Sequence, residues 1–450
     1  MPDKEVIERL RRMIRGLEAK KGAWSPDPAP FLSSSPSPRP TYSPDLESGS
    51  ARDGSNPISR ASHVFPARDY PSLRTESRQE QDYSVITTVY AEGASPELLP
   101  PSPSSLPGFR ALEPSLDSLD GWAYLDIETT GLMGAATVAF LVGVGRWTAE
   151  GFSVDQYFLT SRQGEESMLA ALSEALTGRS ALVTFNGKAF DVPVLQSRYV
   201  MNGMRCPLPL KAHLDFLSLT RTLGRRASYG QSLKEAVRRF TGVVREGDIP
   251  GSMIPALYFI YEREGDPSVL LPVMKHNRLD VVDMACLAWV FGHILTASAE
   301  AGDPEALTGA GKLHLRRRNL ELARRCLETA GRGASDWGRV TGDGEALRLR
   351  LLARVLRRQQ DWQGAIEALE TLVSSAPAKD EDYLSLARCY ELGPRDLSKA
   401  METVDRALAR HDGATDEIPE GLLKRKRRLE RAVARRHRLT KPPGEENIGP

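Results

Sequence analysis

Apolar residues follow two different patterns along the 450-residue chain, and the pattern changes near residue 300. Between residues 120 and 298, short apolar runs typical of buried strands alternate with stretches that have the spacing of one helix face. Beyond Pro304 only the helical spacing is found. The patterns therefore predict an α/β domain over 120–298 and a separate all-helical region after it.

The order of the predicted elements gives the fold class of the α/β domain. Strands are expected at 122–127, 136–147, 152–160, 181–185 and 212–216. Helices are expected at 164–177, 231–241, 254–263 and 268–298, with one more through Val194, Leu195 and Tyr199. Three strands in succession, followed by alternating strands and helices, indicate a mixed sheet with helices on its faces.

The N-terminal residues differ from the rest in composition. Residues 1–22 have apolar positions at helical spacing and are predicted to form an amphipathic helix that docks on the protein, self-associates or binds a partner. Eight prolines and ten serines occupy residues 25–60, a composition that cannot bury enough apolar surface to fold. We predict a largely disordered linker over 23–115, with one β-prone segment at 83–90 as an extra edge strand.

The helical region contains an internal similarity. Ala353 and Ala387 occur in similar contexts 34 residues apart, and Ala365 and Ala400 do so 35 residues apart. The period and the small residues resemble the tetratricopeptide repeat, which implies a helical repeat domain over 304–415 and a protein partner for it. Ala/Leu-rich helix hairpins of no particular family are the alternative.

The last segment, 416–450, is strongly basic. Ten of the 18 residues from Lys424 to Lys441 are Lys or Arg. Such a run is either the solvated face of a helix or a surface that binds phosphate or another acidic partner.

Charge and cysteine content limit the class of protein. The formal net charge is +1, so the molecule as a whole predicts no polyanionic partner, and only local patches can. The four cysteines form no CxxC pair and are expected to be reduced thiols of a cytoplasmic protein. No signal-peptide core follows Met1, and the longest near-apolar run, 135–145, is too short to cross a bilayer, so no membrane association is expected.

The chemistry begins in the segment Tyr124-Leu125-Asp126-Ile127-Glu128-Thr129-Thr130-Gly131. Its first residues favour a strand, and alternation places Asp126 and Glu128 on one face of it. Two carboxylates on one face of a buried strand repel each other, and a bound divalent cation would remove that cost.

Two further clusters contain acids in a similar setting. Asn186-Gly-Lys-Ala-Phe-Asp191 follows the predicted strand 181–185, so Asn-Gly makes a turn and Asp191 lies at the start of a helix. His276-Asn-Arg-Leu-Asp280 lies within a predicted helix, where residues four apart share one face.

Together these motifs resemble those of the DEDD 3′→5′ exonucleases of the ribonuclease H-like fold, and in particular their YprB-like branch. The resemblance covers 120–298 and implies that Asp126, Glu128, Asp191 and Asp280 bind two divalent cations, Mg²⁺ or Mn²⁺. It also implies hydrolysis of phosphodiester bonds at the 3′ end of DNA or RNA. The sugar preference is left open, because metal chemistry at a phosphate does not depend on the sugar.

His276 is the candidate general base, because imidazole titrates near neutral pH. Histidine-containing members of the superfamily usually place this base five residues before the last aspartate, whereas His276 is four residues before Asp280. The alternative role is to orient a metal ligand. Asp283, one turn beyond Asp280, is interpreted as a solvated acid, with a substitute metal ligand as the alternative. Asp215 is interpreted as a residue that supports the site or the sheet edge.

Two other functions are compatible with the sequence. An endonuclease would use the same metal chemistry in a more open cleft. A non-catalytic scaffold would bind nucleic acid through the α/β domain and recruit proteins through the repeats. Four acids that face a polyanion serve no purpose in such a scaffold, which favours the enzyme.

Overall fold

The computed structural model describes residues 74–91, 106–113, 116, 119–131, 134, 136–208, 210–224, 232–245, 247–298, 303–332, 342–375, 378–411 and 419–440. The chain forms two compact units, Met1–His293 and Ile294–Pro450. The predicted N-terminal helix, 1–22, lies outside the described residues.

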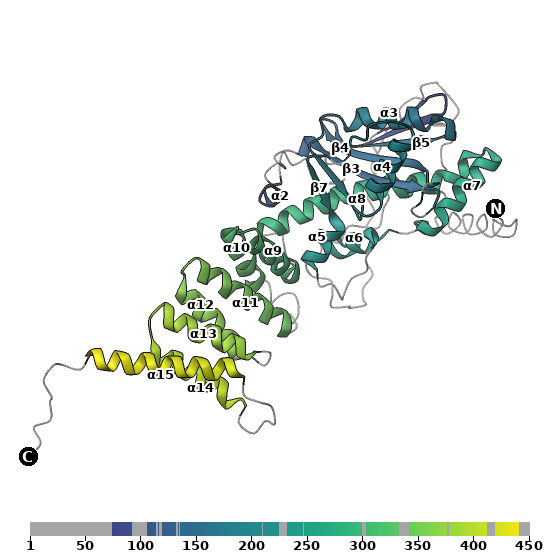
Figure 1. Ribbon diagram of the computed structural model, residues 1–450. Helices are drawn as coiled ribbons and strands as arrows, with labels where there is room; N and C mark the ends of the chain where they lie inside the picture. The colour runs from purple at the N-terminus through teal and green to yellow at the C-terminus, as the bar shows by residue number, and fades with distance from the viewer. Residues whose placement is uncertain are drawn as a thin grey trace, which may run out of the picture. The chain divides into compact units, whose positions relative to one another are not determined.

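One sheet of seven described strands organises the first unit (Figure 1). The strands are β1 (Arg74–Gln79), β2 (Tyr83–Ala91), β3 (Trp122–Thr129), β4 (Ala139–Thr148), β5 (Gly151–Leu159), β6 (Ala181–Thr184) and β7 (Ala212–Asp215). Their order across the sheet is β1-β2-β5-β4-β3-β6-β7. Pairing is antiparallel from β1 to β3 and parallel from β3 to β7. This is the predicted mixed sheet of a ribonuclease H-like fold, and the fold prediction is confirmed.

The helices of this unit follow the predicted order with two additions, α2 and α5. They are α2 (Pro107–Arg110), α3 (Glu165–Leu176), α4 (Asp191–Met201), α5 (Phe216–Leu223), α6 (Leu233–Thr241), α7 (Ile254–Glu264) and α8 (Leu271–Thr296). Short 3₁₀ turns lie at η2 (Leu119–Gly121), η3 (Arg162–Gly164), η4 (Gly251–Met253) and η5 (Pro267–Leu270).

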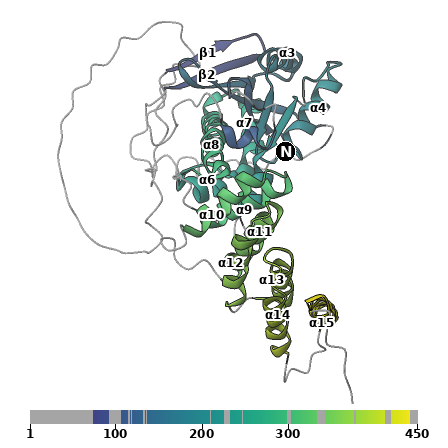
Figure 2. The ribbon, with the colours of Figure 1, turned by 90° about the vertical axis from the view of Figure 1, so that its left-hand side faces the viewer.

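The hairpin β1–β2 corrects the prediction for the N-terminal linker. Residues 83–91 form a strand as expected, but this strand lies inside the sheet, between β1 and β5, and β1 is the edge. Figure 2 shows the two strands side by side at one end of the sheet. Val85 and Ile86 of the predicted β-prone segment lie in the buried core. The interpretation of 23–115 as otherwise largely disordered is wrong for β1, which pairs with this segment. β1 is exposed along its whole length and has no apolar pattern to predict it.

One face of the sheet carries the main apolar core. Ala123, Leu125 and Ile127 project from β3 to this face and belong to one buried cluster with apolar residues of α3, α4 and α7. Phe140 of β4 stacks on Tyr258 of α7 with ring centroids 4.1 Å apart. The intervening residues of β3 face the other way, and these include both candidate acids.

Helix α8 covers the opposite face of the sheet, and two glycines of β4 let it approach. A Cβ atom on Gly143 would lie 2.5 Å from Oδ1 of Asn277, and one on Gly145 would lie 2.5 Å from a methyl carbon of Val281. A side chain at either position would require side chains of α8 to shift. The two glycines therefore fix how close the helix lies to β3 and β4.

Helix α8 also differs from the expectation on membrane spans. With η5 it forms a 30-residue helical segment, Pro267–Thr296, that is long and apolar enough to cross a bilayer, with a mean hydropathy of 1.5 in its best window. Because 72% of that window is buried within the protein, the segment fits the core helix of a globular unit at least as well.

The second unit is helical throughout its described residues. Its helices are α9 (Pro304–Arg316), α10 (Leu320–Arg332), α11 (Gly342–Arg358), α12 (Trp362–Val373), α13 (Asp380–Leu392), α14 (Leu397–Ala409) and α15 (Glu420–Thr440). Each helix packs against the next one in the chain.

The internal similarity extends to the local structure of this unit. Ala365 and Ala400 are fully buried, and each follows an aspartate, Asp361 or Asp396, whose side chain caps its helix by accepting a backbone N–H. The two aspartates are also 35 residues apart (396 − 361). Assignment to the tetratricopeptide family remains a prediction.

The hairpin predicts a stability effect that a linker would not show. Ile86→Ala should lower the free energy of unfolding by about 2–4 kcal/mol, because it leaves a cavity in the core. Arg78→Ala on the exposed strand β1 is the control, with an expected change within about 0.5 kcal/mol. Urea denaturation of both variants tests this, and equal effects would show that the hairpin does not belong to the core.

Candidate functional site

The candidate site lies on the α8 face of strand β3. Asp126 and Glu128 alternate with buried residues of β3 and are themselves partly buried. The pairing of β3 with β4 changes register between Glu128 and Thr129, so the strand departs from regular geometry beside the second acid. The predicted placement of both carboxylates on one strand face is therefore what the structure shows.

Asp191 reaches the same strand from the start of α4. Its Oδ1 accepts a hydrogen bond of 3.2 Å from the backbone N–H of Ile127, between the two acids of β3. The turn before α4 sets this position: Asn186 adopts the left-handed conformation (φ 68°). A Cβ atom on Gly187 would lie 2.5 Å from the Thr184 side chain, so only glycine fits there.

Asp215 supports this turn. Its carboxylate accepts hydrogen bonds from the backbone N–H groups of Asn186 (2.9 Å) and Lys188 (3.2 Å). It also accepts one from Leu217 at the start of α5. The structure thus gives Asp215 the supporting position that its motif indicated.

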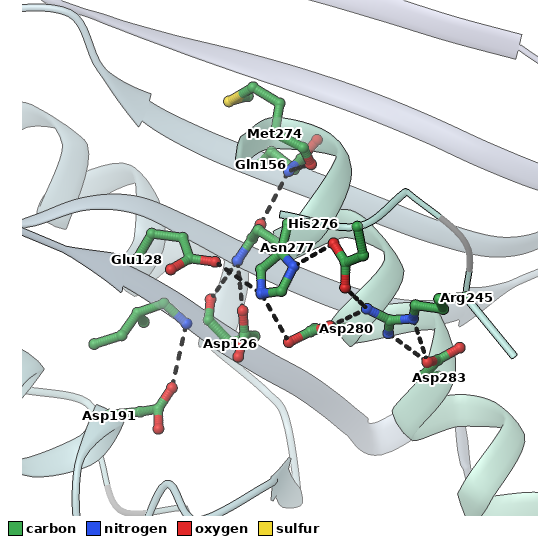
Figure 3. A network of polar contacts seen from close by, with 12 residues as sticks. Asp126, Glu128, Gln156, Asp191, Arg245, Met274, His276, Asn277, Asp280 and Asp283 are labelled. Carbon is green, nitrogen blue, oxygen red and sulfur yellow. Dashed lines mark hydrogen bonds and ion pairs between the residues drawn. The ribbon is translucent and has the colours of Figure 1, made fainter. Parts of the chain in front are cut away.

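His276 and Asp280 face the site from α8, one helical turn apart. Nε2 of His276 lies 3.7 Å from Oδ2 of Asp280 and 4.0 Å from Oε1 of Glu128. The prediction that residues 276 and 280 share a helix face is confirmed. Figure 3 shows both side chains directed toward the acids of β3.

Asn277 holds Asp126 in place, a role that sequence reasoning missed. Its Nδ2 donates to Oδ2 of Asp126 at 2.8 Å and to the backbone carbonyl of Asp126 at 3.1 Å. Its Oδ1 accepts from Gln156 at 2.9 Å, and Asn277 is fully buried. Asp126, Gly143 and Gln156 are directly paired across β3, β4 and β5, so Asn277 spans three strands above the glycine (Figure 3).

The loop after α6 contributes two charged residues that were also missed. Arg245 forms ion pairs with Asp280 and Asp283 and lies 3.6 Å from Asp248. Oδ1 of Asp248 lies 2.6 Å from Nδ1 of His276. The hydrogen bond fixes the imidazole so that Nε2 faces the acids. Neither residue lies in a motif near the acids, so only the fold brings them together.

The interpretation of Asp283 as a solvated acid is wrong. Its side chain is fully buried and forms an ion pair with Arg245. A buried carboxylate of this kind requires a partner charge, because an isolated ion in the interior costs several kcal/mol.

Burial and mutual repulsion dominate the electrostatics of the carboxylates. The pKa of Asp126 is raised well above its usual value by burial and by the charges of Asp280, Glu128 and Asp191, while the hydrogen bond from Asn277 lowers it. The three other acids are therefore close enough to Asp126 to raise the cost of its ionisation.

Glu128 and Asp191 are shifted in the same direction. Burial raises the pKa of Glu128 to about 8, against the opposing effect of the His276 charge. Burial raises the pKa of Asp191 to about 7, although hydrogen bonds from backbone N–H groups lower it. In the arrangement seen here, protons supply part of the charge neutralisation that the carboxylates require.

His276 is, beside Arg245, the second positive group next to these acids. Burial lowers its pKa, but the hydrogen bond to Asp248 and the charges of Asp280, Glu128 and Asp248 raise it to about 9. The imidazole is therefore protonated at neutral pH in this arrangement. The role of His276 as general base remains a prediction, and in this arrangement its pKa lies above the neutral range that the role requires.

The chemical type of the side chains suits a hard cation, but their positions in this structure do not form a metal site. Carboxylate oxygens are the ligands that Mg²⁺ and Mn²⁺ prefer, and the acids lack full compensation for their charge. Within the described residues, however, no three Asp, Glu, His or Cys side chains are grouped closely enough to hold a metal ion. Arg245 is paired with Asp280, so this acid is committed to another cation.

Comparison with known proteins agrees with the fold. Residues 123–290 match the sequence model of the RNase_H superfamily, a range that contains all four acids and His276. The matched range is the greater part of the α/β domain. Proteins of this superfamily are typically nucleases that use divalent metals, so the similarity supports a nuclease-type activity and a nucleic-acid substrate.

Two further similarities describe how the chain relates to other proteins. The uncharacterised protein YprB of Bacillus subtilis (strain 168) is 28% identical over 314 residues, which cover 68% of this chain and 74% of that protein. The structure of the family B DNA polymerase from the hyperthermophilic archaeon Pyrobaculum calidifontis matches 53% of this chain and 29% of its own, with 13% identity and a TM-score of 0.31. At that score the likeness to the polymerase carries no argument.

The close approach of α8 to β4 can be tested by a single methyl group. Gly143→Ala should lower the free energy of unfolding by about 1–3 kcal/mol, because the new Cβ displaces Asn277 from Asp126. Gly251→Ala is the matched control, since a Cβ there meets no atom within 4 Å. Urea denaturation of both variants measures the difference, and equal stability would contradict the role given to Gly143.

The raised pKa values predict how stability depends on pH. Glu128 keeps its proton up to about pH 8 when folded, whereas its ordinary pKa is 4.5, so unfolding releases a proton between these values. Asp191 and His276, with folded pKa values of about 7 and 9, act in the same direction. The free energy of unfolding in chelator should therefore fall by several kcal/mol from about pH 5 to pH 8.

Glu128→Gln removes one of these titrating groups and should make the free energy of unfolding depend less on pH. Thermal unfolding in EDTA at several pH values measures both proteins, with Glu174→Gln, an exposed acid on α3, as the control. Added Mn²⁺ should raise the wild-type melting temperature most at the alkaline end, where the acids are ionised. A wild-type profile that rises toward pH 8 in EDTA would contradict the assignment.

Proposed function

We propose that the first unit is a metal-dependent nuclease that hydrolyses phosphodiester bonds, as a 3′→5′ exonuclease on DNA or RNA. The convergence of four carboxylates from β3, α4 and α8 supports the proposal most strongly, because it raises the pKa of Asp126, Glu128 and Asp191. A fold requires no such cluster for stability, because unpaired buried acids destabilise it. The cluster is therefore best explained by cations that neutralise it.

Asp126, Glu128, Asp191 and Asp280 are the residues that would hold two Mg²⁺ or Mn²⁺ ions. The ions, when bound, supply neutralisation of the charge on the attacking and leaving oxygens of the phosphodiester. The protein orients the carboxylates: Asn277 fixes Asp126, and the backbone N–H of Ile127 fixes Asp191. Asp280 contributes once Arg245 no longer pairs with it.

His276 is placed to handle a proton at Nε2. Asp248 engages Nδ1, so the proton that His276 gains or loses toward the site is the one on Nε2. Because the charges of Asp280 and Glu128 contribute to its raised pKa, neutralisation of these acids brings the pKa of His276 back toward neutral pH. His276 then acts as the general base for water, with Asp248 as the positioning residue.

A single assay tests the proposal. Purified protein with Mn²⁺ should shorten a 5′-labelled linear oligonucleotide progressively from its 3′ end. Asp126→Asn should reduce the rate by at least about 10³-fold, because a metal ligand is lost without a change of shape. Glu174→Ala should leave the rate unchanged.

The assay also separates the alternatives. Cleavage of a circular single strand, which has no 3′ end, would replace the exonuclease by an endonuclease. Binding without hydrolysis, equal in wild type and Asp126→Asn, would contradict the proposed enzymatic activity and favour the non-catalytic scaffold. Parallel DNA and RNA substrates report the sugar preference.

A further inference from the structure

The basic C-terminal segment forms helix α15, and its charges are sorted onto two faces. Residues 420–440 are helical, so side chains three, four and seven positions apart share a face. α15 packs along α14, where Figure 1 shows it as the long yellow helix. The segment predicted as a basic tail is therefore, over this range, a helix attached to the second unit.

One face of α15 is attached to the rest of the unit. Leu422 and Leu429, seven residues apart, are fully buried in the same apolar cluster as residues of α13 and α14. Arg425 and Arg428 both form ion pairs of 2.8 Å with Glu391 of α13. Lys426 forms one of 2.8 Å with Asp405 of α14. The basic residues on this side have a structural role.

The opposite face carries arginines without such partners. Arg427, Arg431 and Arg435 are exposed and follow one another at intervals of four residues. None of their side chains forms a hydrogen bond or ion pair with any residue that the structure describes. On the same side Lys424 is already paired with Glu420. The three guanidinium groups therefore form a row, which we name the arginine face.

The arginine face costs stability in the free protein. Like charges four residues apart on a helix repel each other, by a few tenths of a kcal/mol for each pair. The row extends over about 12 Å, with a charge at about every 6 Å of helix axis. Guanidinium groups bind phosphate with paired hydrogen bonds, and a chain of phosphates would meet successive arginines.

We propose that the arginine face of α15 binds the phosphate backbone of nucleic acid, without base specificity, as a second contact for the substrate of the first unit. This inference rests on the proposed function, which makes nucleic acid the polyanion that the protein meets. A membrane surface fits less well, because membrane-bound helices insert an apolar face and the buried leucines of α15 are already covered.

Charge removal with a matched control tests the inference. The triple variant Arg427→Gln, Arg431→Gln, Arg435→Gln keeps good helix formers in α15 and removes three charges. The control removes three exposed arginines from α10, α11 and α13 with the substitutions Arg325→Gln, Arg354→Gln and Arg388→Gln. Circular dichroism and thermal unfolding should show both variants folded as wild type.

Binding is measured by fluorescence anisotropy with a labelled single-stranded oligonucleotide in EDTA, where no hydrolysis occurs. The α15 variant should bind at least about tenfold more weakly, and the slope of log K against log salt should fall by about 2, because three phosphate contacts are lost. The control should stay within about twofold of wild type. Equal losses in both variants, or none in either, would overturn the inference.

Two more measurements keep this inference distinct from the proposed function. Asp126→Asn should abolish hydrolysis but leave the contribution of α15 to binding intact. If neither the wild type nor any variant hydrolyses the substrate, but binding still depends on the arginine face, the proposed nuclease function is contradicted. Nucleic-acid binding by the arginine face is then supported. Binding of α15 to anionic phospholipid vesicles, with no loss of nucleic-acid affinity in the triple variant, would overturn it.

Discussion

The repulsion between carboxylates beside β3 is the constraint on which the arrangement of the first unit depends. Asp126, Glu128, Asp191 and Asp280 approach one another in a partly buried place, where burial and the neighbouring charges raise the pKa of Asp126, Glu128 and Asp191. Four neighbours reduce that cost: Asn277 and the backbone N–H of Ile127 donate hydrogen bonds, and His276 and Arg245 carry positive charge. The local structure is thus a set of compensations around four acids.

Helix α8 provides two of these four compensations, and β4 determines where it lies. His276, Asn277 and Asp280 lie within about one turn of the helix, so a displacement would move all three together. Gly143 and Gly145 leave the space that α8 occupies, and Gln156 of β5 donates a hydrogen bond to Oδ1 of Asn277. The geometry of the site is therefore set partly by strands that carry none of its acids.

Local sequence was enough to predict part of this arrangement. Alternation in β3 predicted that residues 126 and 128 share a face, and the helical repeat predicted the same for 276 and 280. Arg245 and Asp248 could not be found in this way, because a loop reaches α8 only through the fold. Strand β1 could not be predicted from the sequence, because all of its side chains are exposed. It is defined by its backbone pairing with β2 and has no apolar pattern. Asp283 was misread because its burial depends on Arg245.

Charge is distributed unevenly within a chain whose formal net charge is only +1. Among the described residues in contact at the site, the carboxylates at positions 126, 128, 191, 248, 280 and 283 outnumber the cations His276 and Arg245. Such a surplus repels a polyanion unless cations or protons neutralise it. The arginine face of α15 has the reverse surplus. Binding of a polyanion requires positive charge, whereas binding of the metal ions requires carboxylates, and the two requirements conflict within a single site. With two charge clusters, a nucleic acid would gain affinity from the arginine face and reactivity from the acids.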